Sequence, residues 1–220
     1  MVEWYAALSL VGQNPGKPMK LVGDLRPVLK AGVGVMDDAL EVLSTHMPTL
    51  PTLAKNSYVV FAPGAEYGPA KRWPAKHFAE LASKIDRPVF LLGSNKEFDI
   101  CQEIATTANA KQPGHCFNLA GQTNLMQAFA LIAYAHRVVS NDSGLMHVAA
   151  AFGVPQVAVF GSSSPEHTPP LNDRARVVWL RVDPSYQPPL ACSPCYERNC
   201  PLGHTRCLED VSAERVYRLL

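Results

Sequence analysis

The sequence has little of what marks a membrane-spanning or secreted protein. No stretch approaches the roughly 18 apolar residues that a spanning helix needs. The opening residues, Met1–Tyr5, lack the basic start and the apolar run of a signal peptide. The formal net charge at pH 7 is only +1, which argues against strong electrostatic attraction to nucleic acid or to a membrane surface. We therefore expect a cytoplasmic protein with no membrane span and no nucleic-acid partner.

Two nucleotide-binding motifs are also absent. The sequence contains neither the Gly-x-Gly-x-x-Gly of dinucleotide-binding folds nor the Gly-x-x-x-x-Gly-Lys-Ser/Thr of P-loop proteins. If this protein binds a nucleotide, other loops must hold it.

The first quarter of the chain also lacks the strand and phosphate-binding turn with which a doubly wound domain normally starts. Short helices are expected at 2–10 and 35–43, with a turn-rich segment at 12–27. We interpret residues 1–55 as a linker and the remnant of an interdomain region rather than as a core. The hydrophobic content of 47% is ample for one packed domain, which we place at 56–220.

From residue 57 onward, short apolar runs alternate with helical segments. The runs are continuous and end at Gly, Pro or polar residues, as expected for strands buried on both faces of a parallel sheet. Strands that alternate with helices about every 25 residues imply right-handed βα units. The predicted fold class is α/β, a Rossmann-like parallel sheet flanked by helices. Strands are expected at 58–62, 88–92, 116–119, from 138, at 155–160 and at 176–180, with helices at 74–85, 96–108 and 125–135.

Ligands of such sheets bind at the carboxyl ends of the strands. The turns that are polar or contain glycine all fall at that edge, at residues 63–71, 93–94, 121–124, 141–144 and 161–167. Five turns of similar character therefore converge on one ligand site.

The stretch Val138–Gly153 is the centre of this pattern, because a β-branched run stops at a polar turn and a helix of small residues begins. The first N–H groups of that helix and its partial positive charge favour an anion. Asp142 or Ser143 can cap the helix, and Gly144 lets a ligand approach the backbone. His147 falls about one turn further on and faces the same opening. The alternative is that Asp142 is a plain N-cap.

Two other turns carry groups that suit phosphates. Lys71 and Arg72 lie in a long loop before a helix start, where two cations could hold a diphosphate; the alternative is a solvated surface pair. Ser162–Ser164 precede Pro165, so their hydroxyls could meet a second phosphate or a sugar; the alternative is an ordinary turn.

Four of the six cysteines crowd into residues 192–207, which also contain His204. Thiolate and imidazole ligands at such short spacing could hold a structural zinc ion or an iron–sulfur site. The spacing differs from that of a standard zinc ribbon, so reduced or occasionally bridged thiols remain the alternative. The candidate ligands are Cys192, Cys195, Cys200 and Cys207.

Four motifs together resemble those of the ADP-heptose:lipopolysaccharide heptosyltransferases of the heptosyltransferase II group, in glycosyltransferase family 9. These motifs are Pro63–Pro74, Asn118–Thr123, Ser140–His147 and Phe160–Pro165. The resemblance runs from about residue 57 to the end and includes the Cys-rich segment. It implies the C-terminal, donor-binding half of a two-domain GT-B enzyme. The family's N-terminal domain, which holds the acceptor and a catalytic base, has no counterpart in this chain.

The resemblance implies transfer of L-glycero-D-manno-heptose from ADP-heptose to the inner core of lipopolysaccharide, with inversion and without an essential metal or other cofactor. It implies a cytoplasmic enzyme that works peripherally at the inner membrane and a half that is inactive alone. Two other hypotheses stay open. One is a non-catalytic module that binds nucleotide sugars. The other, weaker one is a nucleotide-sugar epimerase, for which Asp142 and His147 are the only candidate bases.

The resemblance also implies roles for individual residues. Lys71 matches the lysine that stabilises the diphosphate leaving group, and Asp142 matches the acid that binds sugar hydroxyls; these two are the predicted catalytic residues. Ser143 and Gly144 match the diphosphate cradle. The predicted donor-binding residues are Gly64 and Ala65 through their backbone N–H groups, Lys71, Gly121 and Gln122 near the adenine, Asp142, Ser143, Gly144, His147 and Ser162.

Overall fold

The computed structural model describes residues 26–30, 32 and 34–220. The helix expected at 2–10 and all but the last two residues of the turn-rich segment expected at 12–27 lie outside the described residues. Within the described part of the chain, no helix is long and apolar enough to cross a lipid bilayer.

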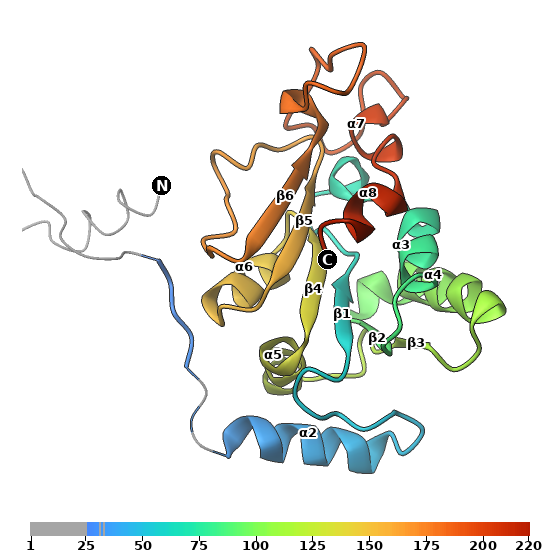
Figure 1. The fold of residues 1–220 in the computed structure, drawn as a ribbon, viewed down its shortest axis with the longest axis vertical. Helices are drawn as coiled ribbons and strands as arrows, with labels where there is room; N and C mark the ends of the chain where they lie inside the picture. Colours follow the sequence, from blue (N-terminus) through green and yellow to red (C-terminus); the bar gives the residue numbers. More distant parts are fainter. Residues whose placement is uncertain (1–25, 31, 33) are drawn as a thin grey trace, which may run out of the picture.

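A six-stranded parallel sheet forms the centre of the fold, with the strand order β3-β2-β1-β4-β5-β6 (Figure 1). The chain builds β1, β2 and β3 outward on one side and then returns to build β4, β5 and β6 on the other. The order therefore reverses between β1 and β4, and a crevice opens at such a reversal in doubly wound folds. The strands are β1 (Val59–Ala62), β2 (Val89–Leu91), β3 (Cys116–Asn118), β4 (Arg137–Asn141), β5 (Gln156–Phe160) and β6 (Ala175–Trp179).

Helices cover both faces of the sheet, as expected for this fold class (Figure 1). On one face α3, α4 and α8 pack over Val59 and Phe61 of β1. On the other face α2, α5 and α6 pack over Tyr58 and Val60, because successive strand residues point to opposite sides. The helices are α2 (Val35–His46), α3 (Ala75–Ala82), α4 (Phe98–Lys111), α5 (Leu125–Tyr134), α6 (Gly144–Ala151), α7 (Arg206–Glu209) and α8 (Ala213–Tyr217), with short 3-10 turns η1 (Pro69–Lys71), η2 (Asn95–Glu97) and η3 (Leu180–Val182).

The expectation that residues 1–55 contribute no core is wrong for α2. Met36, Leu40 and Leu43 of this helix are buried in the same apolar cluster as Leu131 of α5 and Tyr58 beside β1. The helix runs beneath α5 in Figure 1 and adds to the apolar cluster on one face of the sheet. Helix α2 therefore packs against the core of the fold, and the division of the chain into a linker and a domain stays a prediction.

Replacing Leu43 with Ala tests this packing. Leu43 is 1% exposed, so its truncation should lower the free energy of unfolding by about 2–5 kcal/mol through lost burial and the resulting cavity. Val42, the adjacent residue on the same helix, is 48% exposed, and Val42→Ala should change stability by less than about 0.5 kcal/mol. Urea denaturation followed by circular dichroism measures both. Equal effects of the two substitutions would show that α2 is not packed on the sheet.

Candidate functional site

The site forms where the loops after β1 and β4 meet. These two strands are paired neighbours, with Ala62 opposite Ser140 at their carboxyl ends. The loop that carries Lys71 therefore starts beside the turn that carries Asp142. Sequence separation is large, but the reversal of strand order makes the two loops adjacent.

The side chain of Asn141 joins these loops. It is fully buried; its Oδ1 accepts a hydrogen bond from the backbone N–H of Trp73 at 3.0 Å, and its Nδ2 donates to the carbonyl oxygens of Pro63 at 2.7 Å and Gly64 at 3.4 Å. The β1 loop is thus held at both ends by one amide from β4. Sequence reasoning missed Asn141 as a site residue. A side chain that both donates and accepts, placed where a buried strand ends, was the available signal.

Lys71, which is half-buried, and Asp142, which is buried, form an ion pair. Their Nζ and Oδ2 atoms are 2.5 Å apart, and the two side chains are only 18% and 5% exposed. Two alternative interpretations are wrong. Asp142 is not the N-cap of α6, which is Ser143, and neither side chain bonds to the first turn of the helix. Lys71 and Arg72 are not a solvated surface pair, because Arg72 also donates to the carbonyl oxygen of Ala65 at 3.3 Å.

Helix α6 starts at Gly144 beside this ion pair. The first N–H groups of a helix have no partner within it and present a partial positive charge. Apart from its chain neighbours and the helix backbone, no atom of the described residues lies within 4 Å of the place where a Cβ on Gly144 would be, so the backbone is open there. An anion can approach the helix start without meeting a side chain.

A cavity of about 470 Å³ adjoins the helix start. This volume lies within the usual range for small-ligand sites. Its walls come from the ends of β1 and β2 and from the first turns of α5 and α6, and they combine apolar side chains with backbone edges. Among its lining residues are Gly64, Ala65, Gly93, Thr123, Asn124, Leu125, Phe129, Ser143, Gly144, Leu145 and Val148.

Lys71, Asp142 and His147 are not among the residues that line this cavity, and neither are Gly121, Gln122 and Ser162. Gly121 and Gln122 are exposed on the loop before α5, and the next two residues of that loop form the cavity wall instead. Ser162 is buried and lines a separate hollow formed by the Cys-rich segment. Their roles in donor binding stay predictions.

His147 lies on the exposed side of α6, within electrostatic reach of the ion pair. Desolvation lowers the pKa of its imidazole, the negative charge of Asp142 opposes this, and the positive charge of Lys71 lowers the pKa further; the net shift is downward. The charges of Asp142 and Lys71 therefore both influence the pKa of this imidazole, whereas a role of His147 in donor binding stays a prediction.

All four cysteines of the Cys-rich segment line one small hollow of about 20 Å³. All four cysteines are free thiols. The backbone N–H of Thr205 donates to the sulfur of Cys200 at 3.4 Å. In the described residues, no group of three or more His, Cys, Asp or Glu side chains is placed to hold a metal ion. The hollow is lined by Cys192, Cys195, Cys200 and Cys207 together with Ala70, Ser162, Ser193, Pro201, Leu202, His204 and Thr205.

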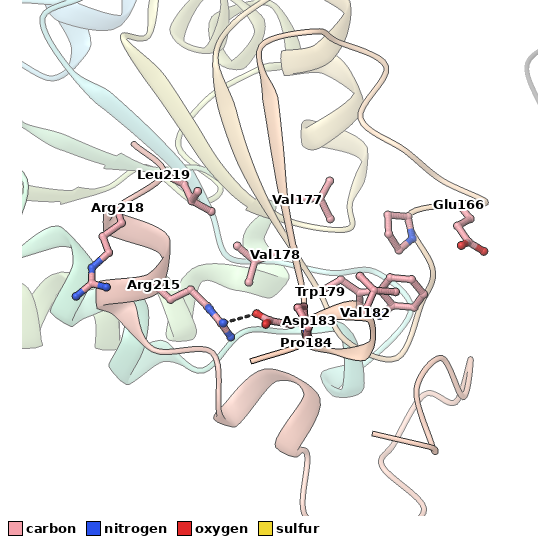
Figure 2. Close-up of a pocket in the computed structure, with 11 residues that line it drawn as sticks. Glu166, Val177, Val178, Trp179, Val182, Asp183, Pro184, Arg215, Arg218 and Leu219 are labelled. Atoms are coloured by element: carbon pink, nitrogen blue, oxygen red, sulfur yellow. Dashed lines mark hydrogen bonds and ion pairs between the residues drawn. The ribbon is translucent and has the colours of Figure 1, made fainter. Parts of the chain in front are cut away.

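A wider groove of about 770 Å³ lies beside β6, away from the ion pair. Figure 2 shows Val177 and Trp179 on one side of it and the ion pair of Arg215 with Asp183 on another. None of the predicted site residues lines it. Of the four sequence motifs, only the last residue of Phe160–Pro165 lines this groove, whereas Lys71 and Asp142 meet in the crevice between β1 and β4.

Comparison with known proteins agrees with this placement. The family described as glycosyltransferase family 9 (heptosyltransferase) matches residues 27–205. The chain belongs to this family. Its family assignment thus rests on most of the described residues, including the loops that carry Lys71 and Asp142.

Named relatives within the family are similar over part of their length. Lipopolysaccharide heptosyltransferase 2 of Salmonella typhimurium is 53% identical over 123 residues, which cover 54% of this chain and 35% of the relative. Lipooligosaccharide heptosyltransferase 2 of Haemophilus influenzae is 40% identical over 184 residues, 82% of this chain and 52% of the relative. The solved structure of E. coli ADP-heptose lps heptosyltransferase II superposes with a TM-score of 0.71 at 37% identity, over 92% of this chain and 54% of that chain. The chain thus spans at most about half the length of these relatives.

The charge environment of His147 gives a test of the site geometry. Its imidazole should titrate below the ordinary pKa of 6.5. Asp142→Asn removes the charge that stabilises imidazolium, so the pKa should fall further, whereas Lys71→Met removes a repulsive charge, so the pKa should rise. NMR titration of the histidine Cε1–H signals measures these shifts.

Lys76→Met is the matched control, because the Lys76 ammonium pairs with Glu209 instead. It should leave the His147 titration unchanged. Identical midpoints in all three variants and the unmodified chain would contradict the placement of His147 beside the ion pair.

Proposed function

We propose that this chain is the donor-binding half of an inverting heptosyltransferase that transfers L-glycero-D-manno-heptose from ADP-heptose to the inner core of lipopolysaccharide. The observation that carries the proposal is the meeting of Lys71 and Asp142 at the start of α6, beside a cavity of about 470 Å³. In one crevice, the ammonium of Lys71 and the start of α6 suit the diphosphate of a nucleotide sugar, and the carboxylate of Asp142 suits its sugar hydroxyls.

The diphosphate occupies the start of α6 in this proposal. When the bond between the anomeric carbon and the phosphate oxygen breaks, negative charge grows on the leaving ADP. The Lys71 ammonium and the first N–H groups of the helix stabilise that charge more strongly than they stabilise the intact donor. Ser143 and Gly144 provide the cradle, and Gly64 and Ala65 contribute backbone N–H groups from the facing loop.

Asp142 holds the heptose. Its carboxylate accepts hydrogen bonds from sugar hydroxyls while it keeps Lys71 in place. His147 and Ser162 are further donor-binding residues in this proposal, His147 at the opening and Ser162 at the loop after β5. Asp142 and Lys71 act together, because each positions the other across 2.5 Å.

The adenosine occupies the cavity between α5 and α6. Leu125, Phe129, Leu145 and Val148 supply apolar surface for the base, and Thr123 supplies a polar edge. Gly121 and Gln122 lie at the approach to this cavity in the same loop.

The acceptor half of the reaction lies outside this chain in the proposal. Since the relatives are about twice as long, an N-terminal domain supplies the lipopolysaccharide contacts and the catalytic base. The complete enzyme works in the cytoplasm at the inner membrane, and this half transfers nothing alone. No cofactor takes part in the transfer.

We further propose that the Cys-rich segment holds a structural zinc ion or an iron–sulfur site. Support comes from the four cysteines that line one hollow and from the N–H of Thr205 that points at the Cys200 sulfur. Binding requires the thiols to close inward from their described positions. The ion would stabilise the segment without entering the reaction.

Calorimetric titration with ADP tests the donor site. The chain should bind ADP more tightly than UDP, and Lys71→Ala should weaken ADP binding by about 10- to 100-fold, because a charge-assisted contact to the diphosphate is lost. ADP-heptose should bind more tightly than ADP, and Asp142→Ala should remove that difference.

The matched control is Lys76→Ala, which removes a 64%-exposed lysine ammonium that pairs with Glu209. ADP affinity should be the same in this variant as in the unmodified chain. Absence of ADP binding, or binding that is indifferent to Lys71, would refute the assignment of this crevice to the donor.

Elemental analysis of the purified chain tests the metal proposal. We expect about one zinc or iron per chain, lost in Cys195→Ser and retained in Cys101→Ala, whose thiol is buried elsewhere in the core. Metal-free protein with four titratable thiols in 192–207 and unchanged stability would show that the segment is held by packing alone.

A further inference from the structure

The part of the Cys-rich segment between Cys195 and Cys200 lies against the loop that carries Lys71. The carbonyl oxygen of Arg198 accepts a hydrogen bond from the N–H of Ala70 at 3.1 Å. The hydroxyl of Tyr67 donates to the carbonyl oxygen of Tyr196 at 3.1 Å. The guanidinium of Arg198 lies 5.0 Å from the centre of the Tyr67 ring, within the range of a cation–π contact.

The same residues are anchored on their other side to the loop after β5. The N–H of Tyr196 donates to the carbonyl oxygen of Ser162 at 2.7 Å. Its ring stacks on His167 with centroids 5.8 Å apart, and its hydroxyl is 2.8 Å from the Nδ1 of that histidine. Residues 196–198 therefore span from the end of β5 to the loop after β1. We call them the strap.

Gly68 shows how closely the strap packs on the Lys71 loop. A Cβ at this position would lie 2.6 Å from the carbonyl oxygen of Arg198, and the backbone φ of +155° is one that other residues rarely adopt. Only glycine allows the two backbones to approach in this way.

Lys71 needs such external support, because it ends η1, a 3-10 turn of three residues that has little stability of its own. Its ammonium lies 5.9 Å from the same Tyr67 ring that faces Arg198. The strap thus contacts Tyr67, four residues before the lysine, and Ala70, which immediately precedes it.

We propose that the strap positions Lys71 for the donor diphosphate, so that Tyr196 and Arg198 are positioning residues of the transfer reaction. The inference rests on the proposed function, since it assumes that Lys71 binds the diphosphate. Arg198 acts through the Lys71 loop and does not itself touch the donor.

The test compares ADP with adenosine, which lacks the phosphates that Lys71 binds. Gly68→Ala should push the strap from the loop and weaken ADP binding about tenfold. Arg198→Ala should weaken it about threefold, and Arg198→Lys should restore most of the loss because it keeps a cation over the ring. Adenosine binding should be unchanged in all three variants.

Two substitutions serve as matched controls. Gly114→Ala also places a side chain on a glycine with positive φ, but no atom lies within 4 Å of the new Cβ. Arg218→Ala removes an arginine that pairs with Glu214 on the last helix. Both should bind ADP as the unmodified chain does.

A double-mutant cycle with Lys71→Ala separates positioning from direct contact. If the strap acts through Lys71, Arg198→Ala should cost nothing further in the Lys71→Ala background. Additive losses would overturn the proposal, because they would mean that Arg198 binds the donor itself. Equal losses for ADP and adenosine would also overturn it, because they would mean general damage to the fold.

These experiments distinguish failure of the strap proposal from failure of the proposed function. If the unmodified chain binds ADP in a Lys71-dependent way while Gly68→Ala and Arg198→Ala bind normally, only the strap proposal fails. If Lys71→Ala itself has no effect, the donor site is wrongly assigned.

Discussion

The amide of Asn141 is the constraint on which the site depends. It holds the β1 loop to the end of β4 through three hydrogen bonds, all in a buried position. A buried amide is costly unless its groups are paired, so the loop has one favourable arrangement rather than several. That arrangement brings Lys71 within 2.5 Å of Asp142. The strand order places the loop after β1 beside the loop after β4. The hydrogen bonds of Asn141 then fix the relative positions of Lys71 and Asp142.

Much of the fold could be predicted because its signals are local. Continuous apolar runs, helical spacing and turn residues fix strands and helices over short stretches, and parallel pairing then brings their carboxyl ends to one edge. Helix α2 was expected at 35–43, but its burial in the core was not. Its own pattern is that of any short amphipathic helix, and its burial comes from α5, which lies about 90 positions along the chain.

The site was predictable in its parts but not in their contacts. Motifs located Lys71, Asp142 and Gly144, whereas side-chain direction after a turn decided that Asp142 pairs with Lys71 instead of capping α6. The position of Ser162 in the hollow of the Cys-rich segment was likewise not predictable from the motif. The contact of Tyr67 with Tyr196 joins residues 129 positions apart, and no local pattern encodes such a contact. Tertiary packing alone determines it.

The charge balance of the crevice bears on its selectivity. Asp142 already compensates the Lys71 ammonium, so a simple phosphate that draws Lys71 away would leave a carboxylate that is 5% exposed without its partner. Breaking a buried pair in this way is costly. In the proposed function a sugar diphosphate avoids the cost, because its hydroxyls donate to Asp142 while its phosphates engage Lys71 and the start of α6. If this proposal holds, the ion pair favours a ligand that carries hydroxyls and phosphates together over one that carries phosphate alone.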